Sequence, residues 1–229
     1  MILAGGYGTR LGETTKSTPK ALIEIGGVPV IDRNIHKLIE IGITEITINT
    51  HFLSKMVKDH LTMKFPELDL RIVYEPKLLG TAGTLRHNID WLAKDDFIVM
   101  HGDNYFQDSL KELLRSHKEA NDGRTATMLT FESEDPQNCG VVELDKMGFI
   151  LHFHEKSNTP PTNVANAAIY VFSKETRQTI LNLSKNETDI SCDLIPRLKR
   201  KMKTVKCLGQ FIDIGTLENL KKANDCENL

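Results

Sequence analysis

Strand-length apolar runs alternate with helix-period segments through the first half of this 229-residue chain. Residues 45–50 (EITINT) alternate as a strand does. Four isoleucine or leucine residues between positions 31 and 39 instead recur at helical spacing before Gly42, a helix-ending glycine. Strand, helix, strand in succession predicts parallel βαβ units with right-handed crossovers. The chain is therefore expected to adopt an α/β fold.

The other segments extend this pattern and then change it. After about residue 124 the strands follow one another with fewer helices between them, which predicts a mixed sheet, and the Pro-rich stretch 158–163 is expected to be a loop. Residues 199–203 are interpreted as an exposed helix face. The expected strands are 1–4, 70–74, 97–100, 125–131, 141–144, 149–153 and 167–172, and the expected helices are 53–63, 84–92 and 110–117.

Charge and cysteine content exclude several classes of function. The net charge is −2, with 29 basic and 31 acidic residues, so the chain lacks the basic excess of most nucleic-acid or anionic-membrane binders. No run approaches the roughly eighteen apolar residues of a membrane span, and no leader pattern is present, so a cytoplasmic protein is expected. The four cysteines are too dispersed for a CxxC site or a disulfide scaffold.

The first candidate ligand-binding loop is 5–11 (GGYGTRL), directly after the first expected strand. Glycines let backbone N–H groups approach an anion, and Arg10 with the later Lys20 adds the positive charge that a polyphosphate requires. The loop is neither a Walker A loop nor a Rossmann fingerprint, because no Gly-Lys-Ser/Thr closes it and Leu11 stands where a glycine is needed. A glycine turn carrying two solvated cations is the alternative.

Two further loops also follow expected strands. Residues 79–84 (LGTAGT) allow a flat ring or a phosphate to lie against the backbone, or form only a helix N-terminus. In His101-Gly102-Asp103-Asn104, Asp103 is well placed to hold Mg²⁺ against phosphate oxygens, or else it caps the next helix.

Two later patches are weaker when taken alone. Glu155 and Lys156 end one expected strand, and Asp213 ends another before a helix. Each could be a surface ion pair or a cap, but Asp213 could also complete a divalent-metal site with Asp103, and Lys156 could meet a second phosphate.

Taken in order, these segments resemble one family. LAGGYGTRL, TPKALIEI, LLGTAGTL, HGDN, FHEKS, NAAIY and FIDIGT are similar to the motifs of the sugar-1-phosphate nucleotidyltransferases and cover nearly the whole chain. The LGTAG element is most similar to the mannose-1-phosphate and D-glycero-D-manno-heptose-1-phosphate guanylyltransferases. The resemblance implies a Rossmann-like nucleotidyltransferase core with a mixed, mostly parallel sheet flanked by helices. It also implies Mg²⁺-dependent attack of a sugar 1-phosphate on the α-phosphorus of an NTP, most simply GTP, with release of pyrophosphate.

The resemblance also implies roles for individual residues. Arg10, Lys20 and Asp103 would be catalytic, and Asp103 and Asp213 would bind Mg²⁺. The implied nucleotide-binding residues are Leu3, Ala4, Gly5, Gly6, Gly8, Thr9, Arg10, Glu75, Gly80, Thr81 and Asp103, and the implied sugar-phosphate-binding residues are Gly140, Glu155, Lys156 and Asn166. The chain would form one domain, 1–229, with a mainly nucleotide-binding half (1–124) and a mainly sugar-phosphate-binding half (125–229). Its expected partners are an NTP, a sugar 1-phosphate and a second copy of the chain, with neither nucleic acid nor membrane.

The sequence departs from the family pattern in three places. Gly12-Glu13 replaces the usual proline-containing continuation and adds a negative charge beside the phosphate loop, and Ala168 replaces a glycine, which would narrow the sugar pocket. The first strand is shorter than usual, which suggests a native start upstream or a frayed edge. Sixteen residues follow Asp213, so a single-function enzyme without an appended acyltransferase domain is expected.

Three alternatives remain open at this point. The chain could be a cytidylyl-, thymidylyl- or uridylyltransferase for another sugar 1-phosphate. It could act on a small phosphate such as phosphocholine. It could also be a silent regulatory subunit that binds a nucleotide sugar, although Arg10, Lys20, Asp103 and Asp213 are all retained.

Overall fold

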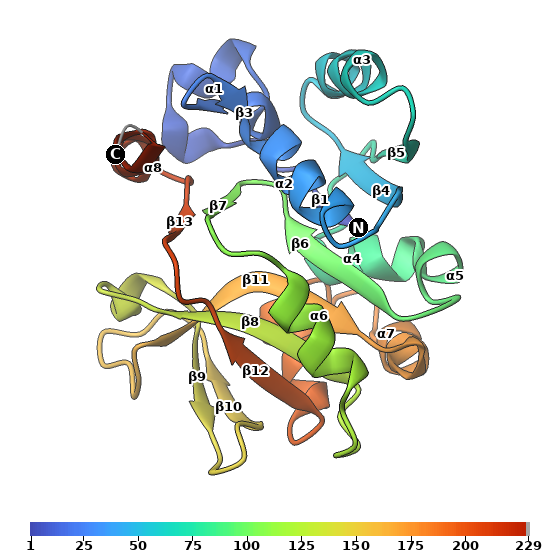
Figure 1. The fold of residues 1–229 in the computed structure, drawn as a ribbon, viewed down its shortest axis with the longest axis vertical. Helices are drawn as coiled ribbons and strands as arrows, with labels where there is room; N and C mark the ends of the chain where they lie inside the picture. Colours follow the sequence, from blue (N-terminus) through green and yellow to red (C-terminus); the bar gives the residue numbers. More distant parts are fainter. Residues whose placement is uncertain (228–229) are drawn as a thin grey trace. The chain divides into compact units, whose positions relative to one another are not determined.

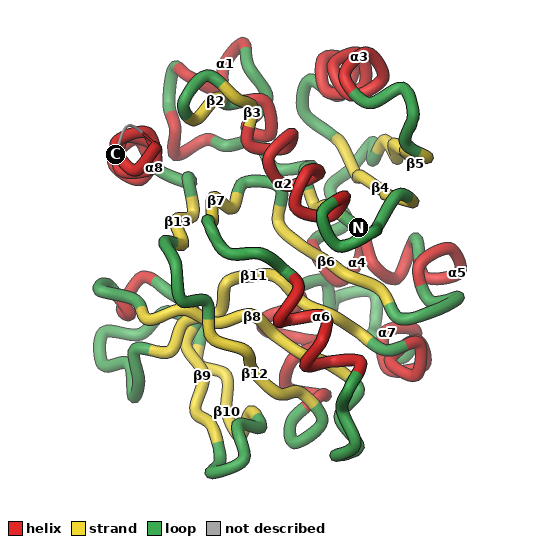
Figure 2. Tube along the Cα trace, in the orientation of Figure 1, coloured by secondary structure: helices red, strands yellow, loops and turns green. Residues whose placement is uncertain are grey.

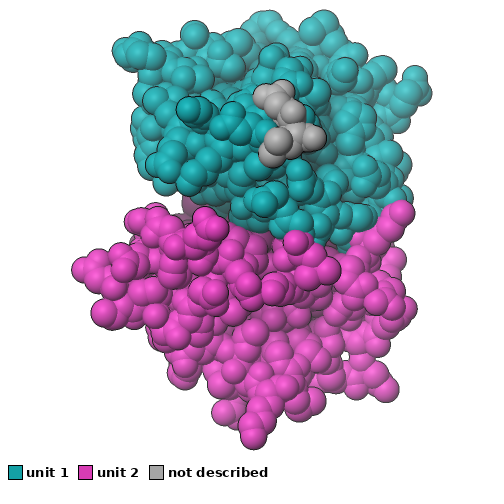
Figure 3. Space-filling view, turned by 60° about the vertical axis from the view of Figure 1, so that its left-hand side comes forward, with its two compact units in different colours: residues 1–78, 100–110, 209–229 teal, residues 79–99, 111–208 magenta. Residues whose placement is uncertain are grey.

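The structure, a computed structural model, describes residues 1–227 of the chain. These residues form two compact units, coloured separately in Figure 3. Unit 1 contains residues 1–78, 100–110 and the segment from Gly209 on, and unit 2 contains residues 79–99 and 111–208. The units therefore do not follow a division at residue 124, because the chain leaves unit 1 and returns to it twice. The assignment of nucleotide and sugar-phosphate halves stays a prediction.

Unit 1 is built on four parallel strand segments, with β1 between β4 and the end of β6 and with β5 beside β4 (Figure 1). Ile2 faces both Ile48 and Met100 in register, so β1 is a central strand. The strands that carry this sheet are β1 (Ile2–Leu3), β4 (Glu45–Thr50), β5 (Asp69–Tyr74) and the last two residues of β6 (Phe97–His101). The predicted parallel arrangement of the first half is confirmed by these pairings.

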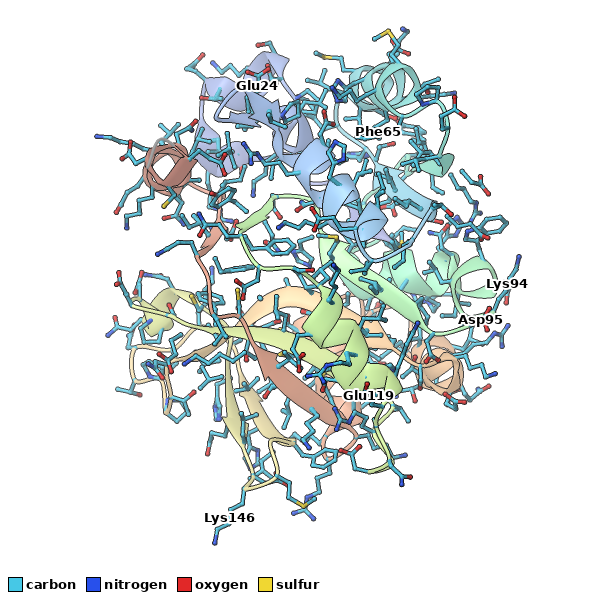
Figure 4. All side chains as sticks on the ribbon, viewed as in Figure 1. Glu24, Phe65, Lys94, Asp95, Glu119 and Lys146 are labelled. Carbon is cyan, nitrogen blue, oxygen red and sulfur yellow. The ribbon has the colours of Figure 1, made fainter. Side chains whose placement is uncertain are left out.

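Two helices of unit 1, α2 (Val30–Ile39) and α3 (Ser54–Lys64), follow its parallel strands and are drawn in red in Figure 2. Helix α2 begins after Pro29, buries an apolar face that includes Ile31 and Ile35, and is followed by Gly42 at φ +82°. The ring of Phe65, labelled in Figure 4, lies 5.4 Å from that of His36 and joins the end of α3 to α2. The helix predicted over 31–39 is thus confirmed.

A second group of elements completes unit 1 around a small core. Strand β13 pairs antiparallel with β7, and helix α8 contacts both β13 and β2. These elements are α1 (Thr14–Ser17), β2 (Glu24–Ile25), β3 (Val28–Pro29), β7 (Asn104–Phe106), β13 (Phe211–Asp213) and α8 (Leu217–Glu227). The buried side chains of this core, from these elements and the segments beside them, are Leu11, Ile23, Ile25, Val30, Tyr105, Ile214 and Ala223. Because Leu11 and Ile214 share this core, it anchors both the first loop and the Asp213 segment.

Unit 2 contains a mixed sheet. Strand β8 pairs antiparallel with β11 and parallel with β12, while β9 pairs antiparallel with β10 and β11. Helix α6 contacts β8, β11 and β12. The elements are α4 (Thr81–His87), α5 (Ile89–Leu92), α6 (Lys111–Lys118), β8 (Ala126–Glu132), β9 (Val141–Leu144), β10 (Ile150–His154), β11 (Val164–Phe172), α7 (Arg177–Leu181) and β12 (Met202–Lys206). Lys146, labelled in Figure 4, marks the turn between β9 and β10.

Of two expectations about secondary structure in unit 2, one holds except at one residue and the other is wrong. Residues 84–92 are helical apart from Asn88, whose side chain donates to the carbonyl of Thr84 and whose backbone leaves helical geometry, which separates α4 from α5. Residues 199–203 are not a helix face, because Arg200 turns the chain at φ +60° and the fully buried Met202 begins β12.

The α/β class with a mixed sheet flanked by helices is confirmed. Among residues 1–227, no helix is both long and apolar enough to cross a bilayer.

Candidate active site

The carboxyl ends of the parallel strands of unit 1 bring four chain segments to one edge of the sheet. The glycine-rich loop follows β1, His51 follows β4, Glu75 follows β5, and Asp103 comes two residues after β6. Ligand sites of open α/β sheets lie at this edge. The sequence-predicted residues Arg10, Lys20, Asp103 and Asp213 all belong to this unit.

The glycine-rich loop is held by its own hydrogen bonds. The Thr15 hydroxyl and the Leu11 amide both donate to the Gly8 carbonyl, each at 2.9 Å, and Leu11 is fully buried. Gly8 has φ +68°, and a Cβ there would lie 2.8 Å from the Thr15 methyl carbon, so only glycine fits. Beyond the loop, the carboxylate of Glu13 pairs with Lys16 at 2.6 Å, which offsets the extra negative charge that the sequence carries there.

Lys20 lies between two carboxylates. Its ammonium donates to Asp103 Oδ2 and lies 3.7 Å from Asp213 Oδ1, and its side chain is only 11% exposed. Burial alone would raise the pKa of Asp103, but the charges of Lys20 and His101 and the hydrogen bonds of the carboxylate keep that pKa below its usual value. Asp103 is therefore ionised at neutral pH, the form that binds a cation.

The β7–β13 pairing explains how Asp213 reaches Asp103. Asp213 is in register with Asn104, and the Ile214 amide donates to the Asp103 carbonyl at 3.3 Å. A Cβ on Gly215 would lie 2.6 Å from a terminal nitrogen of Arg10, so the glycine lets the guanidinium approach this backbone. Gly215 was not among the sequence-predicted residues, although its place directly after Asp213-Ile214 in FIDIGT is the signal that could have identified it.

Asp103 and Asp213, near the glycine-rich loop, fit a magnesium ion that is coordinated by both protein carboxylates and substrate phosphates. Mg²⁺ is usually held by one or two carboxylates, with water and phosphate oxygens filling its other positions. Within residues 1–227 no group of three or more histidine, cysteine or acidic side chains is arranged to hold a metal ion. Asp103 and Asp213 match the two-carboxylate pattern.

Glu75 is buried at the end of β5. Its Oε1 accepts a hydrogen bond from Asn49 Nδ2 at 3.1 Å, and Asn49 Oδ1 accepts from the Ala4 amide at 2.9 Å. Both side chains are under 5% exposed. Asn49 thus links the predicted residues Ala4 and Glu75. Sequence reasoning missed Asn49, because nothing in an alternating strand marks one inward polar side chain as a bridge.

The LGTAG loop of unit 2 is packed against residues 188–190. The Ala82 and Gly83 amides donate to the Thr188 carbonyl at 2.8 and 3.3 Å, and a Cβ on Gly80, which has φ +75°, would lie 2.5 Å from the same oxygen. Helix α4 begins at Thr81, so the loop forms a helix N-terminus, and binding of a ring or phosphate against it stays a prediction. The Ala82 and Gly83 amides of this helix already donate to the Thr188 carbonyl, so they are not available to a ligand. A ligand at this loop would contact the surface of Gly80 and Thr81 instead.

The segment after Thr188 continues this contact. Thr81 Oγ1 accepts from the Ile190 amide at 2.8 Å and lies 3.3 Å from Asp189 Oδ2. Asp189 also accepts from the Cys192 amide at 2.9 Å and so caps a π-helical turn, Ile190–Leu194. Sequence reasoning missed Thr188 and Asp189, because their partners lie about 108 positions earlier in the chain.

The predicted sugar-phosphate residues of unit 2 are of two kinds. Glu155 and Lys156 are exposed directly after β10. Gly140 and Asn166 are instead part of the framework. The Gly140 carbonyl accepts from the Asn166 amide at 2.9 Å, and a Cβ on Gly140 would lie 2.5 Å from the Phe153 ring.

The Asn166 side chain forms an irregularity in β11. Its Oδ1 accepts from the Ala168 amide at 2.8 Å, and its Nδ2 donates to the Tyr170 hydroxyl at 2.8 Å and to Ser191 Oγ at 3.4 Å. The pairing of β11 with β8 shifts register between Asn166 and Tyr170, and Ala168 has φ +51°. The position where the family usually has glycine is therefore one where glycine would be unstrained. Sugar binding by these residues stays a prediction.

Comparison with known proteins places the chain in a family. The model of the nucleotidyl transferase family matches residues 1–228. A protein from Sulfolobus acidocaldarius named as a mannose-1-phosphate guanyltransferase is 33% identical over 98% of this chain and 61% of its own length. Mannose-1-phosphate guanyltransferase 2 of Candida glabrata is 31% identical over 94% of this chain and 60% of its own. The chain thus spans about three-fifths of the length of these curated relatives.

Solved structures agree with this assignment. A Bacillus anthracis protein described as a glucose-1-phosphate thymidylyltransferase, in complex with sucrose, has TM-score 0.88 and 28% identity over 98% of this chain and 93% of its own. HddC from Yersinia pseudotuberculosis, complexed with GMP-PN, has TM-score 0.81 and 25% identity over 99% of this chain and 97% of its own. The chain belongs to the nucleotidyl transferase family, and the predicted resemblance is confirmed.

Proposed function

We propose that the chain transfers a nucleoside monophosphate from an NTP, GTP in the first instance, to a sugar 1-phosphate of the mannose or heptose type. The products are an NDP-sugar and pyrophosphate. The observation that carries the proposal is the meeting of Lys20 with Asp103 and Asp213 at the strand ends of unit 1, with Arg10 against Gly215. This set supplies both signs of charge that a metal-bound triphosphate requires.

The chemistry needs positioning more than proton transfer. A nonbridging oxygen of the sugar phosphate forms the new bond to the α-phosphorus. The bond between the α-phosphorus and the oxygen that bridges it to the β-phosphorus breaks, and that oxygen leaves with the pyrophosphate. The attacking phosphate is already an anion at neutral pH, so no general base is needed. Arg10 and Lys20 would orient the phosphates and offset the charge that develops on the leaving pyrophosphate.

Nucleotidyltransferases of this family generally use a divalent metal. In this chain Asp103 and Asp213 would hold it, with Mg²⁺ as the proposed ion. When bound, the ion supplies charge neutralisation at the phosphate oxygens.

The remaining residues divide by unit. In unit 1, Leu3, Ala4, Gly5, Gly6, Gly8 and Thr9 would surround the nucleotide phosphates, and Glu75 would lie toward the base. In unit 2, Gly80 and Thr81 would contact the base, and Glu155 and Lys156 would hold the sugar and its phosphate. Gly140 and Asn166 would shape the sugar-phosphate site through the β11 irregularity. A second copy of the chain stays a proposed partner.

Guanylyl transfer is favoured by the curated relatives named for mannose-1-phosphate guanylyl transfer and by the neighbour complexed with GMP-PN. A thymidylyl transfer to glucose 1-phosphate is the second candidate, because the neighbour with TM-score 0.88 is described as a thymidylyltransferase. The two candidates share the phosphate chemistry and differ in the base and the sugar.

The test is pyrophosphate release with Mg²⁺ over a grid of substrates. GTP, ATP, CTP, UTP and dTTP are each paired with the 1-phosphates of mannose, heptose, glucose, galactose and N-acetylglucosamine, and with phosphocholine. A strong GTP row supports the guanylyl proposal and identifies the sugar. Activity with dTTP and glucose 1-phosphate alone would favour the second candidate, and a blank grid with measurable NTP binding would point to a silent binding subunit.

A further inference from the structure

Two aromatic side chains of unit 1 have no role in the reaction described so far. Tyr7 lies between Gly6 and Gly8 of the glycine-rich loop, and His51 follows β4. The Tyr7 hydroxyl lies 2.7 Å from His51 Nε2, and the two rings meet edge to face with centroids 5.0 Å apart. Tyr7 also lies 5.9 Å from the Phe52 ring, yet it is 48% exposed. The contact between Tyr7 and His51 therefore attaches the glycine-rich loop, at Tyr7, to the segment that follows β4.

The orientation of the His51 ring is set by the hydrogen bond of its second nitrogen, Nδ1. Its Nδ1 lies 2.6 Å from the Glu75 carbonyl oxygen, and a carbonyl can only accept. Nδ1 therefore carries the proton, which leaves Nε2 of the neutral ring as an acceptor for the Tyr7 hydroxyl. The His51 imidazole therefore links the Glu75 backbone to Tyr7 of the glycine-rich loop.

A second attachment holds the inner end of the same loop. The Ala4 amide donates to the buried Asn49, which in turn donates to the Glu75 carboxylate. Only Gly5 and Gly6 lie between the two attached residues, Ala4 and Tyr7. No atom lies within 4 Å of where a Gly6 Cβ would be, so the neighbouring side chains do not restrict this glycine. Without its attachments a Gly-Gly pair has unusually many backbone states.

We propose that His51 is a positioning residue that holds Tyr7, and through it the Gly5–Gly6 backbone, in the conformation that receives the triphosphate. This rests on the proposed function, which assigns the loop to the nucleotide phosphates. A loop that is ordered beforehand loses less conformational freedom on binding, so its ligand binds more tightly. Because Glu75 is the proposed base-side residue, the same network aligns the base and phosphate ends of the nucleotide site.

The test uses variants that each remove one atom pair. Tyr7→Phe removes the hydroxyl and keeps the ring, and His51→Asn keeps a donor for the Glu75 carbonyl but removes the acceptor for Tyr7. We expect each to raise the Kd of GTP and of inorganic tripolyphosphate about three- to tenfold, the range of one hydrogen bond. The double variant should be no weaker than either single variant, since both changes remove the same interaction. The kcat at saturation should stay within about twofold.

Two controls separate positioning from a general effect on folding. Tyr74→Phe removes the hydroxyl of another exposed tyrosine, one residue before Glu75, and should leave both Kd values unchanged. His51→Gln places an amide oxygen near the former Nε2 position and should recover part of the affinity. Thermal melting should differ little among the variants.

A Kd within about 1.5-fold of wild type in both Tyr7→Phe and His51→Asn would overturn the positioning role. If the unaltered chain released no pyrophosphate from any NTP, the proposed function would fail separately. The role of His51 would then be decided by amide ¹⁵N relaxation of Gly5 and Gly6 in the free protein. Greater mobility in Tyr7→Phe supports it, and unchanged mobility contradicts it.

Discussion

At the scale of single residues, charge and burial together decide how a side chain can react. Cys192 is an exposed cysteine of unit 2, next to the proposed sugar-phosphate residue Glu155. Desolvation, followed by the negative charges of Asp189 and Glu155, raises the pKa of its thiol to about 11. The thiolate is the reactive form, so a residue that looks available for modification is held in its inert state.

Cys192 is therefore expected to resist alkylation near neutral pH. At pH 8 its thiolate fraction is about a hundredfold or more below that of an ordinary thiol, and the rate should climb as the pH rises toward 11. Asp189→Asn, which removes one nearby charge, should speed the reaction. The measurement is the rate of iodoacetamide modification of the Cys192 peptide by mass spectrometry. A rate at pH 8 equal to that of glutathione would contradict the prediction.

Ala168 offers a stability prediction at the same scale. Left-handed backbone costs an ordinary residue about 1–2 kcal/mol, while replacing alanine by glycine costs about 0.4–1 kcal/mol through the unfolded chain. Because Ala168 has φ +51°, Ala168→Gly should raise the free energy of unfolding by about 0.5 kcal/mol. The nearby Ala165→Gly, at a regularly paired strand position, should lower it by about 1 kcal/mol. Urea denaturation measures both, and equal losses in the two variants would show that Ala168 is not strained.

At the scale of elements, the β7–β13 pair positions Asp213 because the core beneath it is packed. Ile214 is fully buried with Leu11, Tyr105 and Ala223. Removing its side chain would leave a cavity under the carboxylate-bearing segment, and the neighbouring Gly215 would lose its fixed approach to Arg10. Metal affinity should therefore depend on an apolar residue that contacts no ligand.

Ile214→Ala is expected to lower the free energy of unfolding by about 3 kcal/mol, as other large-to-small core changes do. It should also raise the Mg²⁺ concentration that gives half-maximal activity. Leu217→Ala removes a 56% exposed side chain from the next helix and serves as the control. Urea denaturation together with a Mg²⁺ titration gives both quantities. A loss of under 1 kcal/mol would mean that the core does not position this segment.

The elements also mark where sequence reasoning succeeds and where it fails. Strand β4, at Glu45–Thr50, was predicted with its observed bounds because its pattern is local. The pairing of β7 with β13 and the contact of Thr188 with the LGTAG loop were not predicted, since each joins segments about 105 residues apart. Strand β12 was missed because a run of lysines hides the single buried Met202. Of the candidate site, the charged residues were found from their motifs, whereas the bridging Asn49 and His51 needed the register of β4.

At the scale of the whole molecule, the proposal assigns the phosphates of the two substrates to cations of different units. Arg10 of unit 1 would serve the NTP, and Lys156 of unit 2 would serve the sugar phosphate. Since each would bind one substrate by charge, its loss should weaken the binding of that substrate selectively.

Lys156→Ala is expected to raise KM for the sugar 1-phosphate at least about tenfold with KM for the NTP nearly unchanged. Arg10→Ala should raise KM for the NTP more than that for the sugar 1-phosphate, and it should lower kcat as well. Initial rates with each substrate varied in turn give these constants. Equal increases for both substrates in Lys156→Ala would misplace that residue.

The most direct test of the central claim is ³¹P NMR of GTP, mannose 1-phosphate and Mg²⁺ incubated with the protein. We predict that a sugar-linked diphosphate and inorganic pyrophosphate appear in equal amounts. Asp103→Asn, which keeps the shape of the side chain but removes its charge, should fold normally and lower the rate by at least about a hundredfold. Unchanged turnover in Asp103→Asn, or release of inorganic phosphate in place of pyrophosphate, would contradict nucleotidyl transfer at this site.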